Sequence, residues 1–381
     1  MPPSAWILAG RKEPSPSSGN SDGITEPAPR RCFSIPCRGI RSPKSSQVIS
    51  RGVCEQSASH IMPRRRDGAD VSYERIKEKL ARDETVLLDG GIGTEVLRRG
   101  VYWRCHGLEQ HPEAVRQVHL DYLAAGADVI KTNTFQLNRR AYSNLFHGLE
   151  HMRRIGPPGL EHKAAKLTRQ AVELARQARH EAGTDSNGAA IAGVISPLEH
   201  SFRPDLAPPP DVAEREHRET VEEMKAAGVD FILFESMNTV QEARAGAAAA
   251  RAAGLPVWVS FVVRESAQLL GGEPIADAAK ALDALGVDVV LVNCAPVEDI
   301  TAALSALAKA RSSPIGAYAH IGRYDPPSWK FGFYPRFSGT DAVPPAKYLE
   351  AAREWKDLGA SVIGGCCGTT PEHIRELRRG L

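Results

Sequence analysis

From Ser72 to the end of the chain, short apolar runs alternate with longer amphipathic stretches, and this alternation narrows the possible folds more than any other feature. The apolar runs, which we interpret as strands, are Val86–Leu88, Asp128–Ile130, Ala190–Ile195, Phe231–Phe234, Val257–Val262, Val287–Val292, Ile315–Tyr318 and Ser361–Ile363. The helices predicted between them include Glu113–Ala125, Lys163–Ala182, Asp211–Ala227, Val240–Ala253, Ile275–Leu285, Asp299–Ala310 and Ala346–Leu358. Apolar strands separated by amphipathic helices are typical of a parallel sheet covered on both faces. Eight such units favour a (β/α)8 TIM barrel, with a doubly wound open sheet as the alternative.

A short internal repeat precedes the even-numbered strands of this pattern. Each of them is entered through a glycine that follows a predicted helix, at Gly126, Gly228, Gly286 and Gly359. Glycine adopts the left-handed conformation that ends a helix, and a short turn then leads into the next strand. The recurrence in alternate units supports a regular barrel.

The composition changes near residue 66, which divides the chain into two parts. Residues 1–66 are rich in Ser, Pro and Arg, and they show no apolar periodicity. Such a segment cannot bury enough surface to fold alone, so we expect a disordered extension followed by a barrel over residues 72–381. An Arg-rich, acid-poor start is also typical of a transit peptide, and residues 1–61 would then direct the chain to a mitochondrion or another organelle. The other interpretation is an upstream extension, with the functional start at Met62.

The overall composition excludes several classes of protein. The chain has 48 Lys and Arg residues against 46 Asp and Glu residues, a balance that argues against a dedicated nucleic-acid or membrane-surface binder. No apolar run approaches the roughly 18 residues of a membrane span. Seven cysteines in 381 residues are sparse and form no disulfide framework. A reducing compartment is therefore expected, and we predict a cytoplasmic protein.

The barrel prediction places the chemistry at the carboxyl ends of the strands, whose loops share one face. The segments at these ends are Asp89-Gly90-Gly91-Ile92-Gly93-Thr94-Glu95, Lys131-Thr132-Asn133-Thr134-Phe135, Glu235-Ser236, Asn293-Cys294, His320 and Gly364-Gly365-Cys366-Cys367-Gly368. Adjacent cysteines rarely form a disulfide with each other, because the peptide between them strains its geometry. In a closed barrel only one strand separates Cys294 from Cys366 and Cys367. Three thiolates with one open position are the layout of a catalytic Zn²⁺ site, and buried structural cysteines are the alternative.

Four segments resemble the homocysteine S-methyltransferase family, namely Asp89-Gly90-Gly91-Ile92-Gly93-Thr94, Thr132-Asn133-Thr134-Phe135, Asn293-Cys294 and Gly364-Gly365-Cys366-Cys367-Gly368-Thr369-Thr370-Pro371. The resemblance covers about residues 72–381 in the family's order. It implies a zinc-bearing barrel that transfers a methyl group to L-homocysteine and forms methionine. It also implies that Cys294, Cys366 and Cys367 bind Zn²⁺, and that Asp89 and Glu235 hold the amino group of the substrate.

Some of these residues have a second interpretation. Asp89 can instead cap the turn after the first strand. Gly90 and Gly91 suit a close approach of the backbone to the amino-acid substrate, since their spacing is not that of a phosphate loop. Asn293 is a candidate substrate-binding residue, but Asn133 and Asn293 can both simply bond neighbouring backbone.

The methyl donor is inferred from what the chain lacks. No cobalamin or folate module accompanies the barrel, and the chain ends 14 residues after Cys367, without the C-terminal extension of the betaine-using branch. The resemblance is therefore to the branch that uses S-methylmethionine or S-adenosylmethionine. A methyltransferase for another thiol or selenol and a non-catalytic zinc-binding barrel remain alternatives. We expect a monomer or a small homo-oligomer.

His320 departs from the family pattern. At this strand end the family often shows Pro-Asn followed by a small residue and Gly, whereas this chain has Ala319-His320-Ile321-Gly322. An imidazole there can fill the fourth position on the metal when substrate is absent. The alternative is a histidine that bonds backbone at the barrel rim.

Overall fold

The computed structural model of this protein describes residues 67–101, 104–183, 188–311, 313–325, 336–338 and 342–381. The predicted disordered extension over residues 1–66 lies outside them, and so does the transit-peptide interpretation of residues 1–61. The described chain begins with helix α1 (Asp67–Ala81), slightly ahead of Ser72, where the barrel pattern starts in the sequence.

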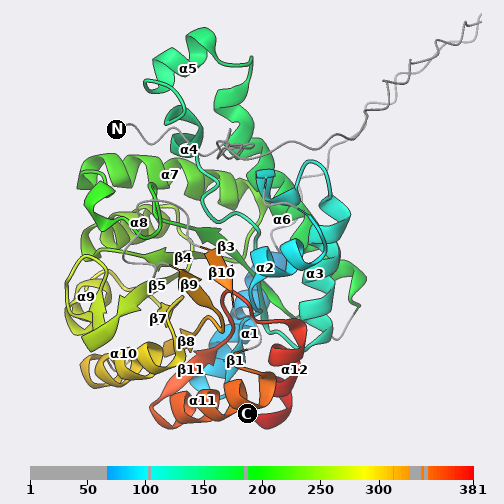
Figure 1. Cartoon of the computed structure of the whole chain (residues 1–381), viewed down its shortest axis with the longest axis vertical. Coiled ribbons are helices and arrows are strands. Elements are labelled where there is room, and N and C mark those ends of the chain that lie inside the picture. The colour runs from blue at the N-terminus through cyan, green and yellow to red at the C-terminus, as the bar shows by residue number, and fades with distance from the viewer. Residues whose placement is uncertain (1–66, 102–103, 184–187, 312, 326–335, 339–341) are drawn as a thin grey trace, which may run out of the picture. The chain divides into compact units, whose positions relative to one another are not determined.

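Eight parallel strands form the barrel, which confirms the predicted fold (Figure 1). They are β1 (Val86–Leu87), β2 (Val129–Lys131), β3 (Ala190–Ile195), β4 (Phe231–Met237), β5 (Val257–Arg264), β7 (Val289–Asn293), β8 (Ile315–Tyr318) and β11 (Ala360–Ile363). Their order in the sheet is β1-β11-β8-β7-β5-β4-β3-β2. A parallel bridge between Leu88 and Val129 then joins the last strand of this path to the first. This closure distinguishes a barrel from a doubly wound open sheet.

The number of paired residues differs between neighbouring strands of the barrel. Strands β5 and β7 pair through five residues each, from Trp258 opposite Val289 onward. Strand β1 pairs with β11 through only two, Val86 and Leu87. Between β1 and β2 the chain relies on the single bridge, supported by the Asp89 N–H, which donates to the Val129 carbonyl at 3.0 Å. The contacts of β1 with its two neighbours, β11 and β2, are therefore the shortest pairings of the barrel.

Helices surround the strands (Figure 1). Those that follow the predicted pattern are α3 (Pro112–Ala124), α6 (Lys163–Glu181), α7 (Pro210–Ala227), α8 (Val240–Ala252), α9 (Ile275–Asp283), α10 (Val297–Ala310) and α11 (Pro345–Asp357). Helices that the pattern did not predict are α1, α2 (Ile92–Arg98), α4 (Arg139–Ser143), α5 (Leu149–Ile155) and α12 (Pro371–Gly380). Short 3-10 turns are η1 (Arg104–Gly107), η2 (Leu160–His162), η3 (Pro204–Leu206) and η4 (Glu265–Ala267).

Local sequence accounts for the helix boundaries. Helix α7 begins at Pro210, where the missing N–H of proline costs nothing because the first turn has no acceptor for it. It ends at Gly228, whose φ of 90° lies in the left-handed region. The other three glycines of the predicted repeat also have positive φ. Gly254 does the same before β5, an odd-numbered strand, so the repeat extends beyond the alternate units.

The core has two layers. Side chains from the outward faces of the strands pack against the helices in one large apolar cluster. A second cluster fills the barrel and includes Phe231 and Trp258, whose ring centroids lie 4.5 Å apart. Helix α1 contributes Tyr73 to this interior cluster, and the Trp258 Nε1–H donates to the Tyr73 hydroxyl at 3.1 Å. Since Tyr73 packs on residues near the amino ends of the strands, α1 covers that end of the barrel.

Two additions interrupt the regular units. The connection from β2 to α6 carries α4, α5 and η2, and α5 stands out from the barrel in Figure 1. Between β8 and α11 lies an antiparallel pair, β9 (Arg323–Asp325) with β10 (Arg336–Ser338). A further short strand, β6 (Gln268–Leu269), pairs with the end of β5.

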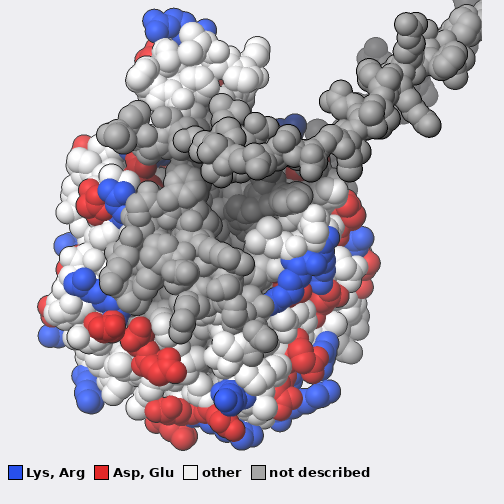
Figure 2. All heavy atoms as spheres, viewed as in Figure 1, with Lys and Arg blue, Asp and Glu red and all other residues white. Residues whose placement is uncertain are grey.

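The described surface carries charges of both signs. On the face shown in Figure 2, acidic and basic side chains are intermixed around the rim. None of the helices in the described ranges combines the length and the apolar character that crossing a membrane requires.

Candidate active site

Three cysteines meet at the carboxyl ends of the strands. Cys294 follows β7 directly, and Cys366 and Cys367 lie in the loop after β11. Their sulfur atoms all lie within 4.8 Å of one another, and Cys294 and Cys366 are buried. In a tetrahedral site with metal–sulfur distances of about 2.3 Å, the sulfurs are about 3.8 Å apart, so this cluster needs little adjustment to bind one ion.

Backbone hydrogen bonds to the β8 region hold the three cysteines in place. The Cys294 N–H donates to the Tyr318 carbonyl at 3.3 Å, and the Cys366 N–H donates to the Ala319 carbonyl at 3.0 Å. The Cys367 carbonyl accepts from the Ile321 N–H at 3.1 Å. Cys294 itself has a φ of 54°, a left-handed conformation that costs a non-glycine residue about 1 kcal/mol. The fold therefore tolerates local strain to turn this thiol toward the other two.

The chemistry of the donor set fits a metal. Hydrogen bonds from Cys366 and Cys367, together with burial, raise the pKa of Cys294 well above its usual value. For Cys366, a hydrogen bond with Cys294 acts to lower the pKa, but the hydrogen bond with Cys367 and burial outweigh it and raise the pKa. Cys294 and Cys366 would therefore stay protonated without a cation, and a bound Zn²⁺ deprotonates coordinating thiols. Three cysteine ligands would leave one position of a tetrahedral ion for another ligand.

The two glycines after Asp89 are required by packing against the cysteine loop. A Cβ on Gly91 would lie 2.6 Å from the Cys366 carbonyl oxygen, and a Cβ on Gly90 would lie 2.6 Å from the Tyr122 hydroxyl. The Gly91 N–H donates to Thr369 Oγ1 at 3.1 Å, and that hydroxyl donates to the Cys366 carbonyl at 2.7 Å. This close approach explains the glycines, and their predicted contact with substrate stays a prediction.

Asp89 and Glu235 lie at the same end of the barrel, with Lys131 between them. The Lys131 ammonium is 3.2 Å from Glu235 Oε1 and 3.6 Å from Asp89 Oδ1. Asp89 Oδ2 also accepts from the backbone N–H of Lys131 at 2.8 Å, so Asp89 ties the first strand end to the second and does not cap its own turn. Sequence reasoning assigned Lys131 no role, although a lysine directly after a buried strand was a usable signal.

Burial dominates the protonation of this group. It raises the pKa of Asp89 to about 7, while the Lys131 charge and the backbone hydrogen bond from Lys131 act in the opposite direction. For Lys131, burial acts to lower the pKa, but Glu235 and Asp89 outweigh it and raise the pKa above its ordinary value. Lys131 is therefore charged at neutral pH.

Asn293 connects the acidic group to the cysteines. It ends β7 immediately before Cys294, and its Nδ2 donates to the Ser236 hydroxyl at 2.7 Å. Its Oδ1 is buried and accepts no hydrogen bond from the described residues. A buried acceptor without a donor lowers the stability of the protein. A ligand with an N–H group could donate a hydrogen bond to this oxygen. Asn133 instead takes the structural option, since its Nδ2 donates to the backbone carbonyl of His106 at 2.7 Å.

Comparison with known protein families identifies the family of this chain. Residues 86–381 match the family described as homocysteine S-methyltransferase. The chain belongs to the homocysteine S-methyltransferase family. It is therefore an enzyme of the methyltransferase class.

Individual relatives agree with this assignment. The chain is 31% identical over 321 residues to the homocysteine S-methyltransferase of Escherichia coli, covering 80% of this chain and 97% of the relative. It is 28% identical over 323 residues to a selenocysteine Se-methyltransferase of Brassica oleracea, covering 77% and 88%. The crystal structure of the metallated form of the homocysteine methyltransferase MmuM from Escherichia coli superposes with a TM-score of 0.65 at 28% identity, covering 80% and 99%.

His320 lies beside the cysteines of this methyltransferase but is not one of the three residues whose ligand atoms cluster. It is buried, and its backbone N–H donates to the Ala295 carbonyl at 3.2 Å. Burial lowers the pKa of His320, and the neighbouring charge of Cys367 and the Cys294 backbone act to raise it. The imidazole therefore lies near both ligand residues, and its role as a fourth ligand stays a prediction.

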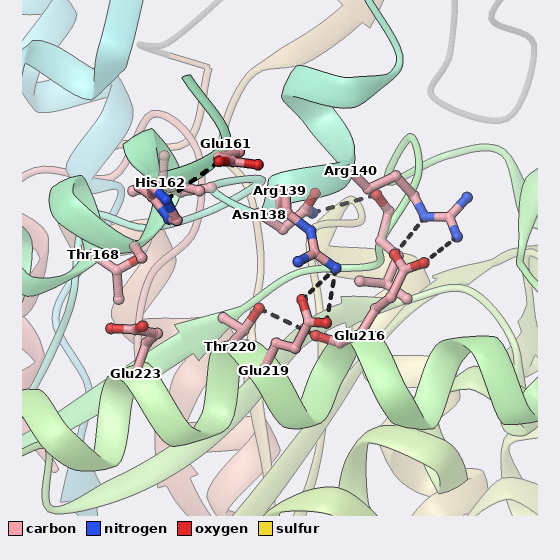
Figure 3. Close-up of a pocket in the computed structure, with 14 residues that line it drawn as sticks. Asn138, Arg139, Arg140, Glu161, His162, Thr168, Glu216, Glu219, Thr220 and Glu223 are labelled. Carbon is pink, nitrogen blue, oxygen red and sulfur yellow. Dashed lines mark hydrogen bonds and ion pairs between the residues drawn. The ribbon is translucent and has the colours of Figure 1, made fainter. Parts of the chain in front are cut away.

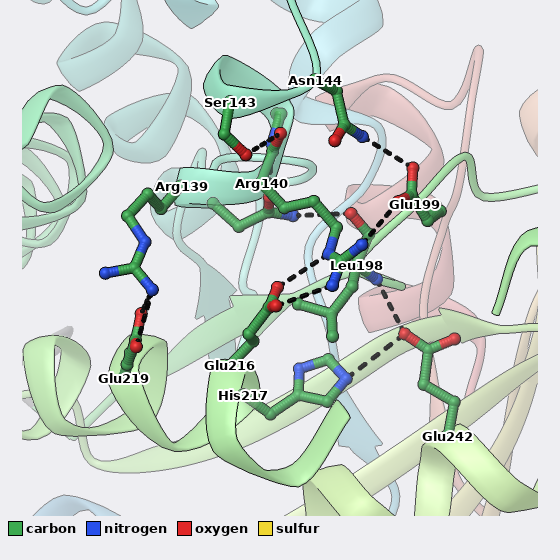
Figure 4. A network of polar contacts seen from close by, with 12 residues as sticks. Arg139, Arg140, Ser143, Asn144, Leu198, Glu199, Glu216, His217, Glu219 and Glu242 are labelled. Carbon is green, nitrogen blue, oxygen red and sulfur yellow. Dashed lines mark hydrogen bonds and ion pairs between the residues drawn. The ribbon is translucent and has the colours of Figure 1, made fainter. Parts of the chain in front are cut away.

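A separate cavity of about 280 Å³ lies outside the barrel of the methyltransferase, under the α4–α5 addition (Figure 3). None of the three cysteines lines it. Its charged side chains form ion pairs with one another or with neighbouring charged residues. Arg140 makes two hydrogen bonds to Glu216 on α7, at 2.6 and 2.7 Å, and a third to Glu199 at 3.0 Å (Figure 4). This polar network joins the addition to α7.

Proposed function

We propose that this protein transfers a methyl group from a sulfonium donor to the thiol of L-homocysteine, forming methionine in a zinc-dependent reaction. The observation that carries the proposal is the cluster of three cysteine thiols, two of them buried, at the carboxyl ends of the strands, within one site that also holds Glu235 and Asn293. Membership of the homocysteine S-methyltransferase family supports the acceptor. The donor proposed is S-methylmethionine or S-adenosylmethionine.

Cys294, Cys366 and Cys367 would hold the ion. When bound, Zn²⁺ keeps a coordinated substrate sulfur deprotonated and nucleophilic at neutral pH, where a free thiol with a pKa near 8.5 is mostly protonated. The remaining groups orient the acceptor and exclude water. Glu235 and the buried Asn293 Oδ1 are acceptors suited to its ammonium group. A sulfonium donor leaves as a neutral thioether, so the protein does not have to supply a strong general acid.

A second acceptor is favoured by one finding. A relative with nearly the same identity as the others is named selenocysteine Se-methyltransferase. A selenol is a soft nucleophile like a thiolate, and the same three-cysteine site would accept it. Selenocysteine is therefore the alternative acceptor.

The test is a methyl-transfer assay with zinc-loaded protein. S-methylmethionine, S-adenosylmethionine and betaine are each offered with homocysteine, and the active donor is then offered with selenocysteine. We expect methionine from one or both sulfonium donors and none from betaine. Faster methylation of selenocysteine would support the alternative acceptor. Failure with every pair, in a protein that still binds zinc through the three cysteines, would favour the non-catalytic barrel.

Other properties remain proposals that accompany this function. They are a role in methionine biosynthesis, a cytoplasmic location and a monomeric or small homo-oligomeric state. Size-exclusion chromatography with light scattering would measure the last of these directly.

A further inference from the structure

Lys131 puts an ammonium group where a substrate ammonium was expected. The family resemblance predicts that Asp89 and Glu235 together hold the amino group of the acceptor. In the structure, the Lys131 Nζ lies within 3.6 Å of a carboxylate oxygen of each. It also donates to the Gly365 carbonyl at 3.4 Å and lies 4.7 Å from the centre of the Tyr318 ring. The cation is thus surrounded by acceptors supplied by the protein.

The two carboxylates are not equivalent around this cation. Asp89 is completely buried, and one of its oxygens is engaged by the Lys131 backbone while the other faces the Lys131 ammonium. Glu235 keeps a small exposed fraction, 9%. It lies near the carboxyl end of β4, and the hydroxyl of the next residue, Ser236, accepts a hydrogen bond from Asn293. Glu235 is therefore the carboxylate that a substrate can reach.

We infer that Lys131 determines acceptor specificity by occupying the position between Asp89 and Glu235, so that Glu235 alone receives the ammonium group of the acceptor. Asp89 then acts as a positioning residue through Lys131. The inference rests on the proposed function for the identity of the acceptor. It differs from the prediction, made from the resemblance, that both acids contact the substrate.

Substitutions at Lys131 and Asp89 change the net charge of the group formed by Asp89, Lys131 and Glu235. At pH 8, above the pKa of Asp89, the three residues carry a net charge of about −1. Lys131→Met makes it about −2, and Asp89→Asn makes it about 0. The double variant Lys131→Met/Asp89→Asn returns it to about −1. If Lys131 sets the specificity, the preference for an ammonium-bearing acceptor should be strongest in Lys131→Met and weakest in Asp89→Asn. The wild type and the double variant should lie between them.

The first measurement compares homocysteine with 4-mercaptobutanoate, which keeps the thiol and carboxylate but lacks the amino group. The preference is the ratio of kcat/KM for the two acceptors. We expect Lys131→Met to raise it about tenfold, mainly through a lower KM for homocysteine. Asp89→Asn should lower it, and the double variant should restore the wild-type ratio to within about twofold. An unchanged or lower preference in a folded Lys131→Met protein would overturn the inference.

The second measurement is thermal unfolding at pH 8, which does not depend on any acceptor. Lys131→Met leaves two buried carboxylates without their cation, so its Tm should fall by about 5–10 °C. The double variant should recover at least half of that loss. Lys280→Met is the matched control, because Lys280 lies 4.0 Å from Asp277 in an exposed pair, and its Tm should stay at the wild-type value.

The two measurements separate two kinds of failure. Wild-type protein that methylates neither acceptor would refute the proposed function, and the unfolding data would then decide the inference alone. A double variant no more stable than Lys131→Met would show that Asp89 and Lys131 are not coupled, and would overturn the inference whatever the acceptor.

Discussion

At the scale of single residues, Cys294 combines strain with chemistry. Its left-handed backbone is unfavourable for a residue with a Cβ, yet it directs the thiol toward Cys366 and Cys367. Ser236, at the end of β4, has the same unusual conformation, with a φ of 63°. Both residues lie at the carboxyl ends of strands, beside the candidate site. The strained backbone at these two positions lowers local stability, but it places the side chains toward the site.

Replacing one of the three cysteines should remove the metal. We expect about one zinc per wild-type chain, and Cys294→Ala or Cys366→Ala should lose most of it with nearly all activity, because two thiolates complete only half of a tetrahedral site. Metal content is measured by plasma emission spectroscopy on dialysed protein. Cys54→Ala is the control and should keep its zinc. Retention of a full equivalent by Cys294→Ala would exclude Cys294 as a ligand.

The raised pKa of Asp89 predicts a specific pH dependence of stability. With a folded pKa of about 7 and an ordinary value of 3.8, Asp89 keeps a proton in the folded protein that the unfolded chain releases between these pH values. Its contribution to stability is complete below about pH 4 and is lost as pH rises toward 7. The Tm of the wild type should therefore fall from pH 5 to pH 7 relative to that of Asp89→Asn.

The control for this experiment is Asp277→Asn, whose aspartate is exposed. Its Tm should follow the wild-type curve at every pH. Parallel curves for wild type and Asp89→Asn would mean that Asp89 does not hold a proton in this range.

At the scale of secondary-structure elements, the addition between β2 and α6 depends on charged contacts more than on apolar burial. Helix α4 has no buried residue, and α5 has only Met152. Arg140 instead joins this segment to α7 and to the loop that follows β3, through three hydrogen bonds (Figure 4). Arg139 makes a more exposed pair with Glu219.

Arg140→Ala should loosen this addition without unfolding the barrel. A partly buried bidentate pair contributes more than an exposed one, so chymotrypsin cleavage at Tyr142 and Phe146 should become about tenfold faster, equivalent to about 1.4 kcal/mol of local stability. Arg139→Ala, with a single exposed partner, should change the rate by less than about twofold. Equal effects of the two variants would contradict a special role for Arg140.

At the scale of the whole molecule, the barrel is strongest around β4, β5 and β7 and weakest where it closes. The two-residue pairing of β1 with β11 joins segments from opposite ends of the described chain, and a single bridge joins β1 to β2. The three cysteines draw on both parts of the barrel, since Cys294 follows the well-paired β7 while Cys366 and Cys367 follow β11, which is paired with β1.

Hydrogen exchange should reveal this unevenness. Local opening costs less where few ladder hydrogen bonds break, so the amides of β1 and β2 should exchange at least about tenfold faster than those of β4, β5 and β7. Mass spectrometry of peptides from the same sample supplies the comparison. Uniform protection of all eight strands would show that the barrel opens only as a unit.

Much of the fold could be predicted because its signals are local. Apolar runs such as Val257–Val262 mark strands, and glycines such as Gly228 mark helix ends, without any knowledge of tertiary contacts. Helices α2, α4 and α5 were missed because each spans less than about two turns, too short for apolar periodicity to appear. Helix α12 was missed although its capping box, Thr370 with His373, is present.

The candidate site could also be predicted only in part from the sequence. The sequence alone determined which residues stand at strand ends, and with them the three cysteines, because strand order in a barrel follows chain order. Only the tertiary structure decided how the acidic residues are used. Asp89, Lys131 and Glu235 come from three different strands, and nothing in their local sequence shows that the Lys131 ammonium lies close to both carboxylates. That arrangement depends on barrel closure, which buries Asp89 completely and leaves Glu235 9% exposed.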